Sequence, residues 1–177
     1  MQYIDYYNSE LGKILLTADD VGLTGLWFVG QKYFESALES EYKEVRTAVL
    51  DDAKTWLDIY FRGKEPDFIP ELHMMGSKFR LVVWEILKKI PYGKTITYDE
   101  IANIIAEQKD IVKISAQAVG GAVGHNKISI IVPCHRVVGK KGSLTGYAGG
   151  LQRKVELLQL EKANLERLFI PKKGTAL

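Results

Sequence analysis

The sequence is poor in the residues that build disulfides and zinc sites. It contains one cysteine, Cys134, and three histidines, His73, His125 and His135. A single cysteine cannot form a disulfide within the chain, which agrees with a reducing compartment. So few cysteines and histidines cannot form a zinc cluster at any familiar spacing either. We therefore expect no metal ion.

Long apolar runs and a signal peptide are also missing. No stretch approaches the roughly 20 apolar residues that a membrane-spanning helix needs. Residues 1–6, MQYIDY, lack the basic start and the apolar core of a signal peptide. With 46% hydrophobic and 26% charged residues, the composition is that of a soluble globular protein. We expect a cytoplasmic protein with no membrane partner.

Charge is distributed unevenly along the chain, although its net value is only +2. Residues 1–75 contain 7 Lys and Arg against 14 Asp and Glu, whereas residues 76–177 contain 17 against 8. An acidic front and a basic back indicate two units with different partners, and the basic unit suits a polyanion. Chance clustering of solvated charges explains the same numbers equally well.

The first unit, residues 1–75, has the pattern of a small α/β domain. Short β-rich runs at 3–7, 12–17 and 23–29 are separated by Asp and Gly, which predicts an antiparallel sheet of hairpins. Apolar residues recur at helical spacing over 45–61, and Gly63 ends that helix. The stretch 63–71 contains two prolines and reads as an extended connection.

The second unit, residues 76–177, has the pattern of a helical domain. Ser77 is a candidate N-cap for a helix through about Lys89. Thr97 and Glu100 form a candidate capping box at the start of a helix over 98–106, and Ser115 can cap a third helix to Gly124. Helix, turn and helix in a basic unit favour DNA binding, although the arrangement is also a common packing motif.

Chemistry is concentrated around the single cysteine. Residues 128–132, ISIIV, are predicted to form a buried strand that stops at Pro133 and leaves Cys134 at its mouth. A thiol attacks only as thiolate, and the neighbouring His135 can accept its proton while Arg136 adds positive potential. The alternative is a buried structural cysteine, because free cysteine is among the most buried residue types.

Several spaced motifs resemble the O6-alkylguanine-DNA alkyltransferases. The run PCHRVV (133–138) resembles their active-site signature, and AVGGAVGHN (118–126) resembles their recognition helix and asparagine hinge. TGYAGG (145–150) resembles their substrate loop, 154–161 their closing helix, and YGKTITY (92–98) the entry to their helix-turn-helix. The match spans about residues 77–165, and the hairpin-plus-helix front suits the variable N-terminal domain of the family.

The resemblance implies an α/β (α+β) fold. A small N-terminal antiparallel sheet with a helix would precede a helical C-terminal domain that carries a winged-helix-like helix-turn-helix and an active-site strand. It also implies DNA repair by a suicidal transferase, without a cofactor and as a monomer. The alkyl group of O6-alkylguanine, and of O4-alkylthymine, would pass irreversibly to Cys134 from a base flipped out of double-stranded DNA.

Four residues are implied to act in catalysis. Cys134 would be the nucleophile and alkyl acceptor, His135 its water-mediated base, and Glu161 the group that orients and polarises His135. Asn126 would join the recognition helix to the active-site strand through side-chain hydrogen bonds. Without the resemblance, Glu161 is an ordinary surface residue of a helix, and Asn126 is a left-handed residue at a helix end.

Five residues are implied to form the base pocket. Tyr98 would donate to the base and crowd the 3′ phosphate, and the carbonyl of Val137 would accept from the exocyclic amine of guanine. Tyr147, Ala148 and Gly149 would complete the pocket, with the amide of Ala148 meeting O6 as charge develops there. Tyr147 between glycines is also consistent with a simple loop anchor.

The implied DNA contacts lie on the minor-groove side, at Gln117, Ala118, Gly120, Gly121 and Arg136. Two glycines inside a helix cost about 1 kcal/mol each against alanine. That cost suggests close approach to DNA, although close packing on the active-site strand explains it too. Gln117 stands where the family often has an intercalating arginine, so we expect weaker support for flipping and more reliance on phosphate contacts.

A second departure is the segment 107–114, which is longer than usual between these helices. Its lysines could contact the DNA backbone, or the insertion could be neutral.

Two other functions remain open from the sequence. A non-enzymatic lesion binder of the alkyltransferase-like group would share the fold but replace the cysteine. A helix-turn-helix regulator or an unrelated cysteine hydrolase would share only parts of the pattern.

Overall fold

The computed structural model describes residues 1–172 and divides into two compact units. Unit 1 contains residues 1–75 together with 127–131, and unit 2 contains 76–126 together with the chain from Val132 onward. The excursion of 127–131 into unit 1 has no counterpart in the sequence-based division at residue 75. No helix in the described part of the chain has the length and apolar character to cross a membrane.

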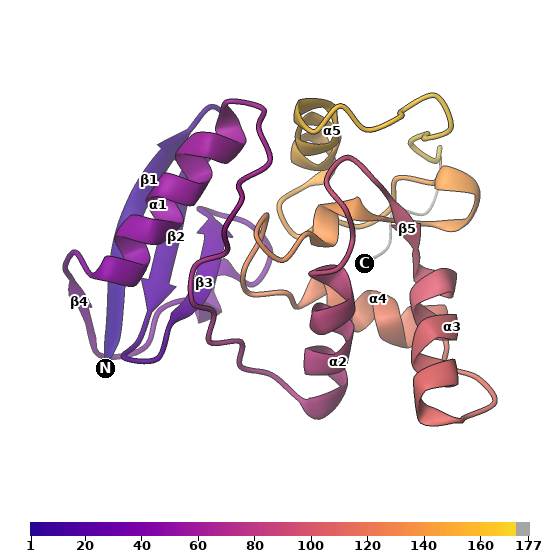
Figure 1. Ribbon diagram of the computed structural model, residues 1–177, viewed down its shortest axis with the longest axis horizontal. Coiled ribbons are helices and arrows are strands. Elements are labelled where there is room, and N and C mark those ends of the chain that lie inside the picture. The colour runs from indigo at the N-terminus through magenta and orange to yellow at the C-terminus, as the bar shows by residue number, and fades with distance from the viewer. Residues whose placement is uncertain (173–177) are drawn as a thin grey trace. The chain divides into compact units, whose positions relative to one another are not determined.

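Unit 1 is built on a four-stranded sheet in the order β3-β2-β1-β4 (Figure 1). The strands are β1 (Gln2–Ser9), β2 (Gly12–Ala18), β3 (Leu23–Phe28) and β4 (Tyr42–Glu44). The first three form the predicted antiparallel hairpins, and β4 adds in parallel to β1. The side chain of Asp19 accepts from the amides of Val21 and Gly22, which fixes the second turn locally.

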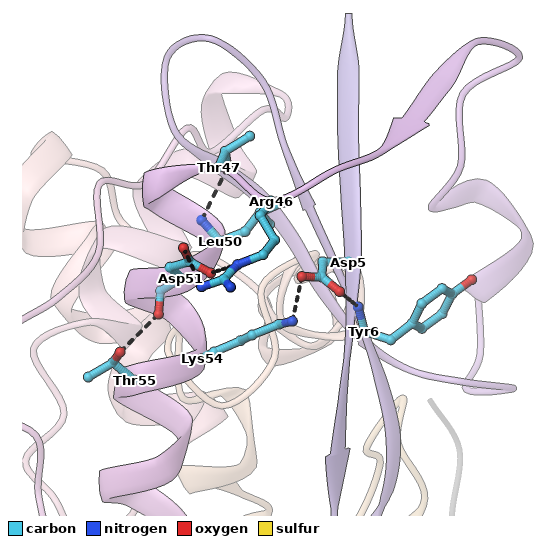
Figure 2. A network of polar contacts seen from close by, with 8 residues as sticks. All are labelled: Asp5, Tyr6, Arg46, Thr47, Leu50, Asp51, Lys54 and Thr55. Atoms are coloured by element: carbon cyan, nitrogen blue, oxygen red, sulfur yellow. Dashed lines mark hydrogen bonds and ion pairs between the residues drawn. The ribbon is translucent and has the colours of Figure 1, made fainter.

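Helix α1 (Ala48–Phe61) packs against this sheet. Thr47 caps it by accepting from the amide of Leu50 at 3.4 Å, and Gly63 with φ 73° follows its end. Figure 2 shows how the first turns are tied down: Lys54 donates to Asp5 of β1, and Arg46 pairs with Asp51 at 3.1 Å. The helix predicted for 45–61 is confirmed, with its first turn beginning three residues later.

Unit 2 is mainly helical and carries its own core around Val138, Leu144 and Leu158. Its helices are α2 (Lys78–Leu87), α3 (Tyr98–Lys109), α4 (Ala116–Gly124) and α5 (Leu151–Leu160). Two short strands, β5 (Ile96–Thr97) and β6 (Val137–Val138), pair in parallel. Helices α3 and α4 pack on each other and give the predicted helix-turn-helix (Figure 1).

Side-chain hydrogen bonds to backbone amides confirm the three predicted helix starts of unit 2. Ser77 accepts from the amide of Arg80, and Ser115 accepts from that of Ala118. Thr97 and Glu100 form the reciprocal capping box, each side chain accepting from the other residue's backbone amide. These ends are set by hydrogen bonds within four residues, which is why the sequence reveals them.

The strand predicted for 128–132 is wrong. Only Ile128 makes a β-bridge, in parallel with Leu26, and the chain then turns through residues 129–131. Ile130 takes the left-handed conformation with φ 69°, which is uncommon for a β-branched residue and interrupts an extended run. Cys134 consequently opens a short 3-10 helix, η2 (Cys134–Arg136), rather than standing at the mouth of a strand.

Candidate active site

The thiol of Cys134 lies in a polar niche of unit 2. Cys134 is 5% exposed, and its Sγ accepts a hydrogen bond of 3.1 Å from Nδ2 of Asn126. The same Nδ2 donates to the carbonyl of Val132 at 2.8 Å. Residues 127–131 belong to unit 1, so the bond from Asn126 to Val132 joins the two ends of unit 2 that flank this segment, while the same side chain also binds the thiol.

Burial and local charge act on the thiol in opposite directions. Burial raises the pKa of Cys134 above its ordinary value, because it disfavours the thiolate. The Asn126 hydrogen bond, the positive charge of Lys154 and backbone amides partly offset that rise in the pKa. At neutral pH the group is therefore a thiol, placed where a thiolate would meet donors and a cation.

The imidazole of His135 is bound to a buried carboxylate. Its Nε2 lies 2.6 Å from Oε1 of Glu161, and both side chains are fully buried. A carboxylate can only accept, so Nε2 carries the hydrogen in the neutral ring and Nδ1 is its basic nitrogen. Burial lowers the pKa of His135 despite the pull of Glu161, which keeps the ring neutral near pH 7.

Glu161 is the centre of this network, at the C-terminal end of α5. Besides His135, it accepts from Nε of Arg136 at 2.9 Å and from the amide of Gly93 at 3.1 Å. Burial alone would raise the pKa of Glu161, but bonds and charge from His135 and Arg136 bring it well below its ordinary value. The carboxylate is therefore ionised at neutral pH.

Arg136, expected from the sequence to contact DNA, makes its hydrogen bonds within unit 2. It is buried, its Nε and a terminal nitrogen both donate to Glu161, and the other terminal nitrogen donates to the carbonyl of Ile90 at 2.6 Å. The guanidinium is thus engaged inside unit 2. These contacts make Arg136 the residue that fixes Glu161 beside His135, and a DNA contact of Arg136 stays a prediction.

Lys154 is the main site residue that sequence reasoning missed. It is fully buried, and its Nζ donates to the carbonyls of Val137, Thr145 and Gly146 at 2.5, 3.0 and 3.0 Å. Burial lowers the pKa of Lys154 to about 8, although the nearby Cys134 acts in the opposite direction. The ammonium group of Lys154 therefore joins Val137, which follows the η2 helix, to the loop at Thr145 and Gly146.

A signal for Lys154 does exist in the sequence. Lys154 and Glu161 stand seven residues apart on the face of α5 that also buries Leu157 and Leu158. Two ionisable residues in line with the apolar positions of an amphipathic helix point inward, where charges occur only with partners.

The five expected pocket residues belong to unit 2, which also contains Cys134. The hydroxyl of Tyr98 donates to the carbonyl of Thr145 at 3.3 Å, and burial, with the nearby Cys134, raises the pKa of Tyr98 to about 12. The ring of Tyr147 meets that of His135 edge-on, with centroids 6.5 Å apart. Val137 and Gly149 are buried and Ala148 is half-buried.

The expected DNA-facing residues of α4 lie on its uncovered side. Gln117, Ala118 and Gly121 are exposed, and Gly120 is half-buried. A Cβ at Gly120 would touch the ring of Tyr98 at 3.8 Å, and one at Gly121 would meet nothing within 4 Å. Packing within the protein therefore does not explain a glycine at 121.

Metal ligands are not grouped in the part of the chain that the structure covers. Among residues 1–172, no three His, Cys, Asp or Glu side chains lie close enough together to hold a metal ion.

Comparisons with known proteins agree over nearly the whole chain. Residues 78–163 match the family model described as the DNA binding domain of 6-O-methylguanine DNA methyltransferase, and residues 2–72 match that of its ribonuclease-like domain. A methylated-DNA–protein-cysteine methyltransferase of Mycolicibacterium paratuberculosis is 42% identical over 161 residues, covering 88% of this chain and 89% of the relative. One from Methanosarcina acetivorans is 42% identical over 163 residues, covering 90% and 97%.

Solved structures of methyltransferases also match the chain over most of its length. A crystal structure of Mycobacterium tuberculosis OGT in complex with DNA matches with a TM-score of 0.78 and 39% identity, covering 90% of this chain and 92% of that one. A crystal structure of the O6-methylguanine methyltransferase of the same organism matches with a TM-score of 0.77, covering 98% and 97%. The chain belongs to the 6-O-methylguanine DNA methyltransferase family.

Proposed function

We propose that this protein repairs alkylated DNA by moving the alkyl group of O6-alkylguanine, and of O4-alkylthymine, onto Cys134. The observation that carries the proposal is the combination around one sulfur. Cys134 Sγ accepts from Asn126, and the adjacent His135 is bound to a buried, ionised Glu161. A structural cysteine needs neither a hydrogen-bond donor on sulfur nor a polarised imidazole beside it.

The transfer is a single in-line displacement at the alkyl carbon. The Cys134 proton passes to Nδ1 of His135, through a water, and Glu161 balances the charge of the resulting imidazolium. The thiolate then forms an S–C bond while the bond from carbon to O6 breaks, and the electron pair leaves with the guanine. Arg136 holds Glu161 in place, so it acts as a positioning residue rather than a catalytic one.

The pocket residues stabilise the leaving base. The raised pKa of Tyr98 keeps its hydroxyl protonated, so it can turn from the Thr145 carbonyl and donate to a guanine that gains negative charge. The carbonyl of Val137 holds the exocyclic amine with its second lone pair, since Lys154 uses the first. Tyr147, Gly149 and the amide of Ala148 form the remaining wall around O6.

Double-stranded DNA binds along the uncovered side of α4, from its minor groove. Gln117, Ala118, Gly120 and Gly121 face it, and the guanine is flipped because O6 lies at the pairing edge inside the stack. We assign DNA binding and alkyl transfer to a domain of residues 76–177, and a separate supporting domain to residues 1–75.

The reaction uses each molecule once, because a thioether does not release its alkyl group under cellular conditions. The protein is thus a single-turnover methyltransferase that needs no cofactor. We place it in the cytoplasm as a monomer, where a reducing environment keeps Cys134 as a thiol.

Mass spectrometry of the Cys134 peptide tests the proposal. After mixing with DNA that contains O6-methylguanine, the peptide should gain one methyl group, and lesion-free DNA should leave it unchanged. A Cys134→Ser variant is the matched control and should bind DNA without modification. An unmodified parent peptide with tight lesion binding would instead identify a non-enzymatic lesion binder.

A further inference from the structure

The turn that joins α3 to α4 (Figure 1) carries exposed apolar side chains. Helix α3 ends at Lys109, and Asp110 reverses the chain in the left-handed conformation with φ 51°. Ile111 is then 44% exposed and Val112 is fully exposed, before Ser115 caps α4. We call residues 109–113 the 109–113 turn.

Packing within the protein does not account for the apolar side chain at the tip of this turn. Val112 is the most exposed large hydrophobic residue in the described part of the chain, and it contributes no buried area. Single exposed apolar residues are ordinary on protein surfaces. Here, however, two adjacent ones form the tip of a turn, and exposed Lys109 and Lys113 flank them.

The position of the turn indicates its partner. Val112 precedes the cap residue Ser115 by three residues, so an extended chain keeps it within about 10 Å of the start of α4. The side of α4 that the protein leaves uncovered begins there, with Gln117 and Ala118. DNA lying along that side passes next to the turn.

The chemistry of the turn also matches a nucleic-acid backbone. Lysines on both sides of a small apolar tip fit phosphates spaced along a strand, with apolar sugar surface between them. An apolar protein groove would accept Ile111 and Val112 but would leave both lysines without anions. Asp110 is the exposed acid of the turn and opposes a phosphate in the same place.

We propose that the 109–113 turn is a second DNA-contacting element, in which Lys109 and Lys113 bind backbone phosphates and Ile111 and Val112 pack on the sugars between them. The inference rests on the proposed function, because it places DNA along α4. It gives this chain phosphate affinity next to Gln117, which carries no charge of its own.

Binding of a lesion-free duplex at several salt concentrations tests the proposal. A Lys109→Ala/Lys113→Ala variant should bind about five- to twentyfold more weakly at low salt. The slope of log affinity against log salt should fall by about 1.8, since each phosphate contact contributes about 0.9. Asp110→Asn, which tolerates the left-handed conformation, should bind more tightly than the parent.

Two further variants locate the effect. Lys43→Ala/Lys64→Ala removes the same charge from exposed positions of unit 1 and should leave the slope unchanged. Ile111→Ser/Val112→Ser should weaken binding without changing the slope, because it removes sugar contacts only. If that variant instead changes the oligomeric state in sedimentation, the tip binds a second copy of the chain and the proposal is overturned.

Alkyl transfer at saturating DNA separates this inference from the function on which it rests. Every turn variant should still methylate Cys134 completely. Complete transfer together with parental affinity and salt slope in the Lys109→Ala/Lys113→Ala variant overturns the role of the turn alone. A parent that neither binds nor transfers overturns both.

Discussion

The buried contact between Arg136 and Glu161 leads to a prediction with a definite sign. In Glu161→Gln the shape is kept but the charge is lost, and the new amide NH2 faces the guanidinium that Glu161 now binds through both oxygens. Removing one partner of a buried ion pair costs about 3 to 5 kcal/mol, because the other charge stays buried. At about 2 to 4 °C per kcal/mol for a chain of this size, the melting temperature should fall by about 6 to 20 °C.

A double variant distinguishes stability from catalysis. Arg136→Met/Glu161→Gln removes both charges, so it should be more stable than Glu161→Gln alone and recover most of the loss. Its transfer rate should nevertheless stay low, about a hundredfold or more below the parent, because an amide cannot balance the imidazolium of His135. Comparing the single and the double variant therefore separates the effect of Glu161 on stability from its effect on transfer.

Denaturant unfolding and rapid-quench single-turnover transfer measure the two quantities. A double variant no more stable than Glu161→Gln would show that Arg136 and Glu161 are not coupled. Parental transfer by the double variant would show that His135 works without the carboxylate. Either result refutes the reasoning, because both roles are derived from the same 2.6 to 3.0 Å contacts.

Two further predictions concern titration in the site. Lys154→Met should slow single-turnover transfer at least about tenfold. It removes the cation near the thiolate and leaves three backbone carbonyls without this hydrogen-bond donor. Because the pKa of Lys154 is lowered from 10.5 to about 8, the parent should gain stability over Lys154→Met as pH rises between those values, in denaturant titrations. The pH profile of transfer should be flat between about pH 6.5 and 8, because burial lowers the pKa of His135 from 6.5, and the rate should fall above about pH 8 as Lys154 loses its charge. An acid limb centred at or above 6.5 in rapid-quench rates would contradict this assignment.

Local hydrogen bonds explain what the sequence predicts well. The caps at Ser77, Thr97 and Ser115 depend on partners three residues away, so residue type and spacing are sufficient to find them. The hairpins of unit 1 follow in the same way from short-range alternation and from turn residues such as Asp19.

Long-range pairing explains what the sequence misses. The β-branched run 128–132 has the composition of a strand, but its only bridge partner in the described chain is Leu26, a hundred residues away. Arg136 has the charge expected of a DNA contact, yet its guanidinium donates a hydrogen bond to Glu161, 25 residues later. Neither partner is visible in the local pattern, so composition alone finds neither contact.

Lys154 is an intermediate case. Its apolar helix face indicates burial, but not which carbonyls it binds, because Val137 and Thr145 approach it only in the folded chain. Motif spacing locates the proposed nucleophile and its proposed base, whereas the charges that act on them come from tertiary contacts.

Burial of Cys134 and the reactivity proposed for it are compatible because the reaction occurs once. An enzyme that turns over must release its product and keep its nucleophile accessible, whereas a stoichiometric acceptor needs to be reached only by a base already inside the pocket. A raised pKa keeps the sulfur as a less reactive thiol until then, which protects it from oxidation and from stray alkylating agents. In the proposed reaction, the hydrogen bond from Asn126 and the positive charge of Lys154 then favour the thiolate once His135 takes the proton. The buried, polar niche thus makes the cysteine selective for a flipped base without making it inert.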